Sequence, residues 1–151
     1  MKKDGEEKPI KVILLGECGV GKTSIILRYS KDKFTPNQDP TIGGAFIEQY
    51  LEKDNNTYKL NIWDTTGQEI YHSLTKLFLQ GADIVILVYS IDDYSTFKAL
   101  DFWHKNIIEI CDENVILAVV GNKYDLFNDD DNEENDVKER VLDEEAEKYA
   151  K

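Results

Sequence analysis

Eight consecutive residues, Gly16 to Thr23, combine glycines, a lysine and a threonine at a spacing that can do chemistry. They read Gly-Glu-Cys-Gly-Val-Gly-Lys-Thr and follow an apolar run, Ile10 to Leu15. Glycines permit a tight bend in which successive backbone N–H groups point into one concavity, and a helix N-terminus adds a favourable dipole. Lys22 can neutralise the outer phosphates of a nucleotide, and the Thr23 hydroxyl can coordinate Mg²⁺. The spacing therefore predicts a phosphate-binding loop rather than an ordinary glycine-rich turn.

A second polar segment, Asp64 to Gln68, follows an alternating strand pattern. An aspartate at a strand end can hold Mg²⁺ through its water shell, because Mg²⁺ usually keeps several waters. Gly67 leaves its N–H able to approach a terminal phosphate closely, and Gln68 can orient a water for in-line attack. The Asp-Thr-Thr-Gly sequence alone would indicate only a commonplace turn. In a chain that also contains a phosphate-binding loop, it predicts phosphoryl transfer to water.

A third segment, Gly121 to Asp125, follows another aliphatic run and bears on which base is bound. A carboxylate only accepts hydrogen bonds, so Asp125 can take both N–H donors of the Watson–Crick edge of guanine. Adenine presents an acceptor there, which opposes the alternative of an adenine-nucleotide kinase. Asn122 can bridge the base and neighbouring loops, and the stem of Lys123 can lie along the ring. The segment favours guanine.

The bulk composition limits the class of protein. The 151 residues suit one domain, residues 10–151, after a charged N-terminal tail, residues 1–9, that we expect to be disordered. A net charge of -12 argues against nucleic acid as a partner. The two cysteines, Cys18 and Cys111, provide no disulfide framework and fit a reducing cytosol. No signal peptide, membrane span, myristoylation site or prenylation box is visible, which predicts a cytoplasmic, soluble chain.

Hydrophobic patterning predicts an α/β fold. Strand patterns occupy five segments: Ile10 to Leu15, Ala45 to Glu52, Thr57 to Trp63, Ala82 to Ile91 and Asn114 to Val120. Helical spacing follows Thr23 and recurs in Glu69 to Leu79, Ser95 to Ile110 and Val137 to Ala150. The second and third strands should form a hairpin through residues 53–56. Strands alternating with helices predict a doubly wound, mostly parallel sheet with one antiparallel edge strand and a ligand at its carboxyl edge.

The three polar segments, in this order and at these spacings, resemble the Ras superfamily of small GTPases, with a P-loop NTPase fold, from about Ile10 to the end. Within that superfamily the chain is similar to Rab proteins, and most similar to the early-endosomal subgroup. The segments that carry this resemblance are Thr41 to Phe46, Leu60 to Asp64, Gln68 to Leu74 and Leu87 to Ile91.

The resemblance implies a role for each matching residue. Lys22 and Gln68 would be catalytic, Thr41 would join the metal site from the first switch loop when the γ-phosphate is present, and Phe34 would pack against the guanine or ribose. Mg²⁺ would be bound by Thr23, Thr41 and Asp64. Nucleotide would be bound by Cys18, Gly19, Val20, Gly21, Lys22, Thr23, Ser24, Phe34, Thr41, Gly67, Asn122, Lys123 and Asp125. An aromatic patch for effectors would comprise Phe46, Trp63 and Tyr71.

The resemblance also implies a function: a monomeric switch that hydrolyses GTP to GDP and regulates vesicular or endosomal membrane traffic through effector proteins. An exchange factor would be a further partner. No arginine stands at the place of Gln38, so a GTPase-activating protein would supply one in trans. The chain would be cytoplasmic and cycle to the cytosolic face of vesicle membranes through a lipidated tail that this sequence lacks.

Three departures qualify that expectation. Thr66 stands where most of the family has alanine, which favours slow hydrolysis or, alternatively, a nucleotide-locked interaction module that binds GTP or GDP with negligible turnover. Cys18 stands where Rab proteins usually have serine; simple substitution is favoured over a redox role. The family's last guanine-contacting loop, final strand and final helix should follow Lys151, which predicts a domain incomplete at its C-terminus.

Overall fold

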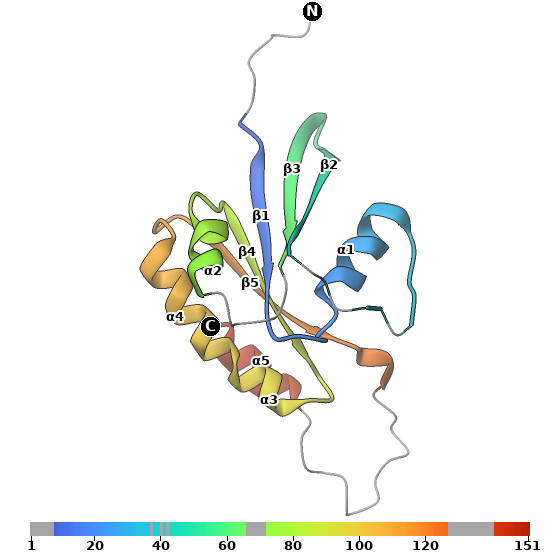
Figure 1. Ribbon diagram of the computed structural model, residues 1–151, viewed down its shortest axis with the longest axis vertical. Coiled ribbons are helices and arrows are strands. Elements are labelled where there is room, and N and C mark those ends of the chain that lie inside the picture. The colour runs from blue at the N-terminus through green and yellow to red at the C-terminus, as the bar shows by residue number, and fades with distance from the viewer. Residues whose placement is uncertain (1–7, 37, 40, 42, 66–71, 127–140) are drawn as a thin grey trace, which may run out of the picture.

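The computed structural model of the protein describes residues 8–36, 38, 39, 41, 43–65, 72–126 and 141–151. Its elements follow in the order β1 (Ile10–Leu15), α1 (Lys22–Lys31), β2 (Ala45–Lys53), β3 (Asn56–Asp64), α2 (His72–Leu79), β4 (Ile84–Ser90), α3 (Tyr94–Lys98), α4 (Leu100–Ile110), β5 (Ile116–Asn122), the 3₁₀ turn η2 (Tyr124–Leu126) and α5 (Asp143–Tyr149). Figure 1 shows α1 on one side of the sheet and α2 to α5 on the other. Within the described ranges, no helix has the length and apolar content needed to cross a membrane.

The sheet has the spatial order β2-β3-β1-β4-β5. The pairs of β1 with β3, β1 with β4, and β4 with β5 are parallel, and β2 pairs antiparallel with β3 at the edge. The predicted fold class is therefore confirmed. Because the carboxyl ends of parallel strands lie at one edge, the three polar segments, at the ends of β1, β3 and β5, begin on the same side of the sheet.

Two apolar clusters hold the helices against the sheet. The cluster under α1 contains Val12, Leu14 and Ile26, which are nearly inaccessible to solvent. The larger cluster, under α2 to α5, includes Ile13 and Trp103. Alternate residues of β1 thus enter opposite clusters, which explains why its sequence is a continuous aliphatic run rather than an alternating one. The strand that precedes the phosphate-binding loop is fixed from both faces.

Some element boundaries differ from the predicted ones. The hairpin turn is two residues, Asp54 and Asn55, rather than four, because both adopt the left-handed conformation (φ 51° and 62°) that such tight hairpins require. The single helix predicted for Ser95 to Ile110 is two helices that meet at Ala99, where Phe102 N–H donates to the Ala99 carbonyl at 3.1 Å. That i to i+3 bond tightens the turn and separates the helices.

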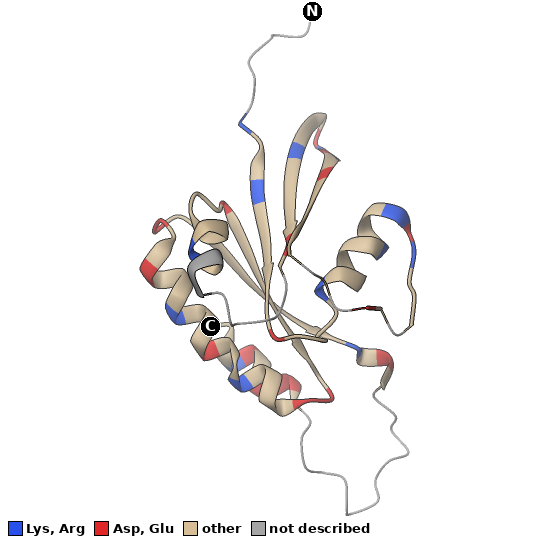
Figure 2. Ribbon diagram, viewed as in Figure 1, with Lys and Arg blue, Asp and Glu red and all other residues tan. Residues whose placement is uncertain are grey.

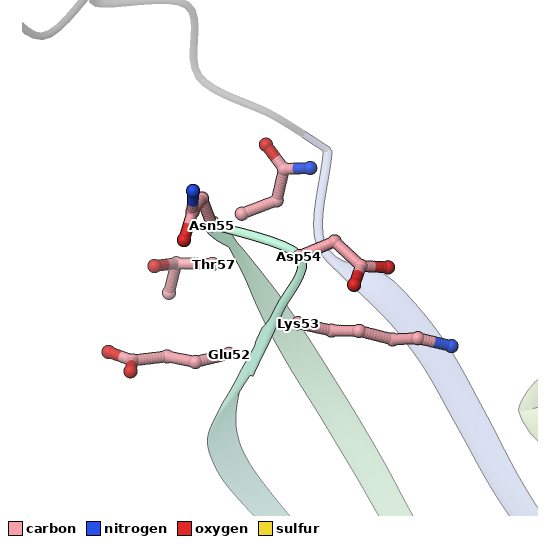
Figure 3. A pocket seen from close by; sticks show the side chains of 6 residues that line it. Glu52, Lys53, Asp54, Asn55 and Thr57 are labelled. Carbon is pink, nitrogen blue, oxygen red and sulfur yellow. The ribbon is translucent and has the colours of Figure 1, made fainter.

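A hollow at the tip of the β2–β3 hairpin is lined by polar residues, Glu52 to Thr57. Figure 3 shows the side chains of Glu52 and Lys53 pointing in opposite directions from the strand. The hairpin lies at the amino end of β3, and so at the sheet edge opposite the three polar segments. It is therefore separate from the predicted nucleotide site.

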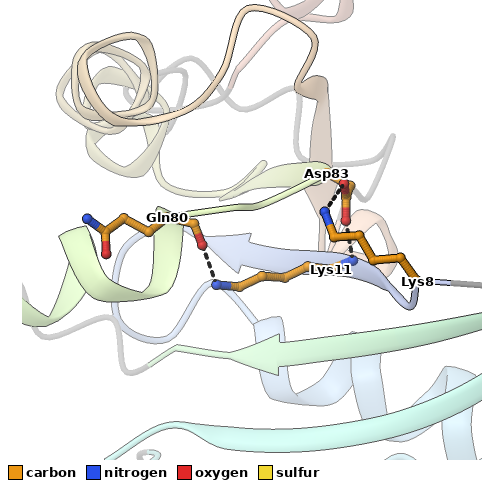
Figure 4. Close-up of polar contacts among 4 residues, drawn as sticks. All are labelled: Lys8, Lys11, Gln80 and Asp83. Carbon is orange, nitrogen blue, oxygen red and sulfur yellow. Dashed lines mark hydrogen bonds and ion pairs between the residues drawn. The ribbon is translucent and has the colours of Figure 1, made fainter.

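The amino end of β1 is held by Asp83, just before β4. The Asp83 carboxylate accepts the backbone N–H of Lys11 at 2.8 Å and pairs with the Lys8 ammonium at 3.6 Å (Figure 4). Lys8 belongs to the predicted N-terminal tail, whose residues 1–7 lie outside the described ranges. At the other end of the sequence, α5 begins with three acidic residues, and Figure 2 marks acidic positions in red on the ribbon of this helix. Negative charge at a helix N-terminus is attracted to the positive end of the helix dipole, so these residues stabilise α5.

Candidate nucleotide-binding site

The loop between β1 and α1 is shaped by two glycines. Gly16 has φ 147°, and a Cβ there would lie 2.1 Å from the carbonyl oxygen of Val88. Gly21 has φ 97°, and a Cβ there would lie 2.2 Å from the Asn122 amide nitrogen. Side-chain-bearing residues avoid both the conformation and the contact. The two glycines therefore let the loop pass close to the Val88 carbonyl in β4 and to the Asn122 amide at the end of β5.

Lys22 opens α1 and folds back over the loop. Its side chain is 5% exposed, and its Nζ donates to the carbonyl of Gly16 at 2.7 Å and to that of Glu17 at 2.9 Å. A buried ammonium is costly unless hydrogen-bonded, and these carbonyls stabilise it inside the loop. The positive charge predicted to meet the outer phosphates is therefore held at the concavity. Cys18 and Gly19 are exposed at the tip, Val20 is fully buried, and Ser24 is half-buried.

Three oxygen-bearing side chains from separate segments converge beside Lys22. The Thr23 hydroxyl donates to Asp64 Oδ2 at 2.6 Å and lies 2.7 Å from the Thr41 hydroxyl. Thr41 Oγ1 is itself 3.5 Å from the same carboxylate oxygen. Thr23 comes from the first turn of α1, Asp64 from the end of β3, and Thr41 from the loop before β2. The structure thus brings together the three residues predicted to hold Mg²⁺.

The environment of Asp64 fits a cation. The residue is 2% exposed, and its Oδ1 accepts no hydrogen bond from any described residue. Burial raises the pKa of this carboxyl above its usual value, although the hydrogen bonds from Thr23 and Thr41 and the charge of Lys22 act in the opposite direction. A buried carboxylate with an unused oxygen, next to two hydroxyls, offers the hard oxygen ligands that Mg²⁺ prefers. The donor set therefore fits a magnesium ion or its water shell.

Replacing Asp64 with asparagine is expected to stabilise the protein without ligands and to remove its response to Mg²⁺. The neutral amide keeps the shape of the side chain but removes a buried charge, which favours folding by about 1 kcal/mol and raises the melting midpoint by about 2–4 °C. Differential scanning fluorimetry with EDTA, and then with Mg²⁺ and GDP, measures both effects. An Asp83→Asn variant, changed at the opposite sheet edge, serves as the control and keeps the Mg²⁺ response. An unchanged Mg²⁺ response in Asp64→Asn would contradict the assignment.

The loop predicted to select the base contacts the phosphate-binding loop directly. The side-chain amide of Asn122 donates to the backbone carbonyl of Val20 at 2.8 Å, and the backbone carbonyl of Asn122 accepts the N–H of Ile91 at 3.1 Å. Lys123 adopts a left-handed conformation (φ 65°), which turns the chain into η2, where Asp125 is exposed. Phe34, after α1, is 58% exposed. The Asn122 side chain therefore joins the end of β5 to the phosphate-binding loop, while its contact with the base stays a prediction; the side chains of Asp125 and Phe34 are exposed.

Several predicted site residues lie outside the described ranges. Gly67 and Gln68, assigned to the terminal phosphate and the attacking water, belong to this group, as do Thr66 and Tyr71. The neighbouring Thr65 is described: its hydroxyl donates to the carbonyl of Leu14 at 2.7 Å and ties the end of β3 to the end of β1. Thr65 therefore lies beside the end of β1, where the phosphate-binding loop begins.

The predicted aromatic patch has a member that sequence analysis missed. Phe46 and Trp63 pack with ring centres 5.0 Å apart, and the ring of Phe78 in α2 lies 5.6 Å from that of Trp63. Phe46 is 48% exposed. Lys11 borders these rings, because its Nζ lies 5.7 Å from the Trp63 ring centre and donates to the Gln80 carbonyl at 2.7 Å (Figure 4). The signal for Phe78 was its place beside Leu79 on the apolar face of a predicted helix.

Comparison with known proteins agrees with this geometry. A family model described as "Ras family" matches residues 11–151. Among individual proteins, the chain is 39% identical to Ras-related protein Rab-22A of Canis lupus familiaris over 143 residues, which cover 95% of this chain and 69% of the relative. It is also 39% identical to GTP-binding protein YPT53 of Saccharomyces cerevisiae over 126 residues, which cover 83% of this chain and 57% of that protein. The chain is thus shorter than both relatives, and it belongs to the Ras family of small GTPases.

Proposed function

We propose that this protein is a guanine-nucleotide switch that binds GTP and GDP with Mg²⁺ and hydrolyses GTP. The observation that carries the proposal is the meeting of Lys22, Thr23, Thr41 and Asp64 at one loop, to which Asn122 is hydrogen-bonded. These residues come from four separate segments. The family match and the identity to a protein named as GTP-binding support the same assignment.

Each group in the proposed site has a separate role in GTP hydrolysis. Backbone N–H groups of the loop and the ammonium of Lys22 stabilise negative charge on the phosphoryl group being transferred. Magnesium, when bound through Thr23, Thr41 and Asp64, supplies further charge neutralisation. Gln68 orients the attacking water. Because such reactions depend on positioning and electrostatics, no strong side-chain base is required.

The positions of Thr41 and Phe46 indicate how effector proteins can read the nucleotide state. Thr41 is at the metal site, and Phe46 is only five residues further along the chain in the aromatic cluster with Trp63 and Phe78. A change at the terminal phosphate therefore has a short path to an exposed apolar surface that effector proteins can read. We assign the protein to vesicular or endosomal membrane traffic, with an exchange factor and a GTPase-activating protein as regulators, on its similarity to Rab-22A.

The proposal is tested by identifying the nucleotide that the protein retains. Mass spectrometry of the small molecules released from purified, denatured protein should find GDP or GTP. Titration with fluorescent analogues should then show that unlabelled GDP competes and ADP does not. Competition by ADP alone would replace the proposal with an adenine-nucleotide enzyme. Retention of neither nucleotide, with no competition, would overturn it.

Thr66 favours a second candidate, a module that binds guanine nucleotide but turns it over negligibly. Its hydroxyl and extra bulk precede Gly67, which is assigned to the terminal phosphate. Thr66→Ala is expected to raise the single-turnover rate of GTP hydrolysis about 10-fold, which corresponds to about 1.4 kcal/mol of barrier. Quenched-flow measurement of phosphate release checks this, with Thr65→Ser as a control that retains the hydroxyl bonded to Leu14. Equal rates in the wild type and Thr66→Ala would refute an inhibitory role.

A further inference from the structure

Trp103 joins helix α4 to the phosphate-binding loop through a single hydrogen bond. Its indole Nε1 donates to the Glu17 carboxylate, at 3.3 Å from Oε1. The indole is 3% exposed and packs in the larger core cluster with Leu100 and Ile107 of the same helix. A donor buried in a packed helix has a fixed position, whereas the half-buried Glu17 side chain has several rotatable bonds. The bond therefore draws the Glu17 carboxylate toward α4.

Glu17 places a carboxylate in a loop that we propose binds anions. Its backbone carbonyl accepts a hydrogen bond from Lys22 Nζ at 2.9 Å, so the residue lies beside the cation assigned to the phosphates. Its side chain carries a negative charge. Like charges a few ångströms apart repel strongly when solvent is partly excluded, so a carboxylate turned toward bound phosphates would weaken binding. The direction of the Glu17 side chain is thus a variable that affects nucleotide affinity.

We propose that Trp103 is a positioning residue that holds the Glu17 carboxylate on the α4 side of the loop, away from the bound phosphates. This inference rests on the proposed guanine-nucleotide site. It assigns a specific task to an indole that composition and patterning place simply in the core. Phenylalanine at this position would fill most of the same space but could not donate the hydrogen bond.

A double-mutant cycle tests the inference. GDP dissociation constants are measured at low salt for the wild type, Trp103→Phe, Glu17→Gln and the double variant. Trp103→Phe is expected to weaken GDP binding about 3- to 10-fold in the wild-type background, because the released carboxylate can approach the phosphates and repel them. In the Glu17→Gln background the same substitution should change affinity less than about 2-fold, because a neutral amide does not repel phosphate. Raising the salt to about 1 M should shrink the difference between backgrounds.

The outcomes separate positioning from packing. If Trp103 acts only through packing, Trp103→Phe will cost the same in both backgrounds, and the inference is overturned. Ile107→Val provides the matched control: it removes one buried methylene from the same helix face, should lower the melting midpoint by about 2–4 °C, and should change affinity equally in both backgrounds.

A second readout does not depend on nucleotide. The indole N–H proton resonance of Trp103, assigned by its loss in Trp103→Phe, should shift when Glu17→Gln replaces a charged acceptor with a neutral one. An unmoved resonance would show that the contact is absent and would overturn the inference. Failure of the wild type to bind GDP, with the resonance shift observed, would instead overturn the proposed nucleotide site while establishing the contact.

Discussion

Lys22→Met is expected to reduce affinity for GDP and GTP by about 100-fold or more. Lys22 is 5% exposed, and its ammonium donates to the carbonyls of Gly16 and Glu17. In the proposed nucleotide complex, its positive charge meets phosphate oxygens at a position where Lys22 is already buried. Two charge-assisted hydrogen bonds lost there correspond to about 3–6 kcal/mol. Methionine retains the length and apolar stem of the side chain, so the substitution isolates the charge.

Equilibrium titration with a fluorescent GDP analogue measures this effect, and circular dichroism confirms that the variant is folded. Lys31→Met is the matched control, because Lys31 lies in the last turn of the same helix and is exposed. Its affinity should stay within about 2-fold of the wild type, since exposed charges at that distance are screened. A folded Lys22→Met protein that binds GDP as tightly as Lys31→Met would remove Lys22 from the site.

The parts of the site that sequence predicted share one feature: each residue lies at the carboxyl end of a buried strand or in the helix turn after it. Thr23 was predicted from the motif of the phosphate-binding loop and Asp64 from its place at a strand end; the two meet because parallel strands bring their ends to one edge whatever the exact register. The same argument placed Asn122 near the loop, where it bonds to Val20. Thr41 lies in no regular element, and its role came from family resemblance rather than strand logic.

The features that sequence missed depend on side-chain packing between distant elements. Phe78 of α2 packs against Trp63 of β3, and the helical spacing that predicts the apolar face of α2 does not specify which residue that face meets. The bond between Trp103 and Glu17 spans 86 positions in sequence, and an indole on an apolar helix face has the same pattern whether or not its N–H has a partner. Likewise, the break at Ala99 comes from hydrogen bonding at the turn rather than from a helix-breaking residue. Periodicity predicts which face is buried but not the contact made there.

The strongest change in specificity is expected from Asp125→Asn. In the proposed site the Asp125 carboxylate accepts both N–H donors of guanine, whereas xanthine has a carbonyl in place of the exocyclic amine and would set an acceptor against the carboxylate. A site built for two donors should reject the xanthine nucleotide by about 1,000-fold or more. Asparagine offers one acceptor and one donor, which matches xanthine. The variant is therefore expected to lose most of its GDP affinity and to bind xanthosine diphosphate about 10-fold more tightly than GDP.

Competition between GDP and xanthosine diphosphate for a fluorescent analogue measures the inversion, and Asp112→Asn is the matched control. Asp112 is also exposed, but it lies before β5, at the opposite end of the strand that leads to Asp125. The Asp112→Asn variant should keep the wild-type preference, because a general loss of negative charge changes the affinities for both nucleotides by a similar factor. Only a residue that faces the base edge can reverse their order. A uniform loss of affinity for both nucleotides in Asp125→Asn, with the order preserved, would mean that the base is recognised by other groups and that Asp125 serves to shape the turn after Asn122.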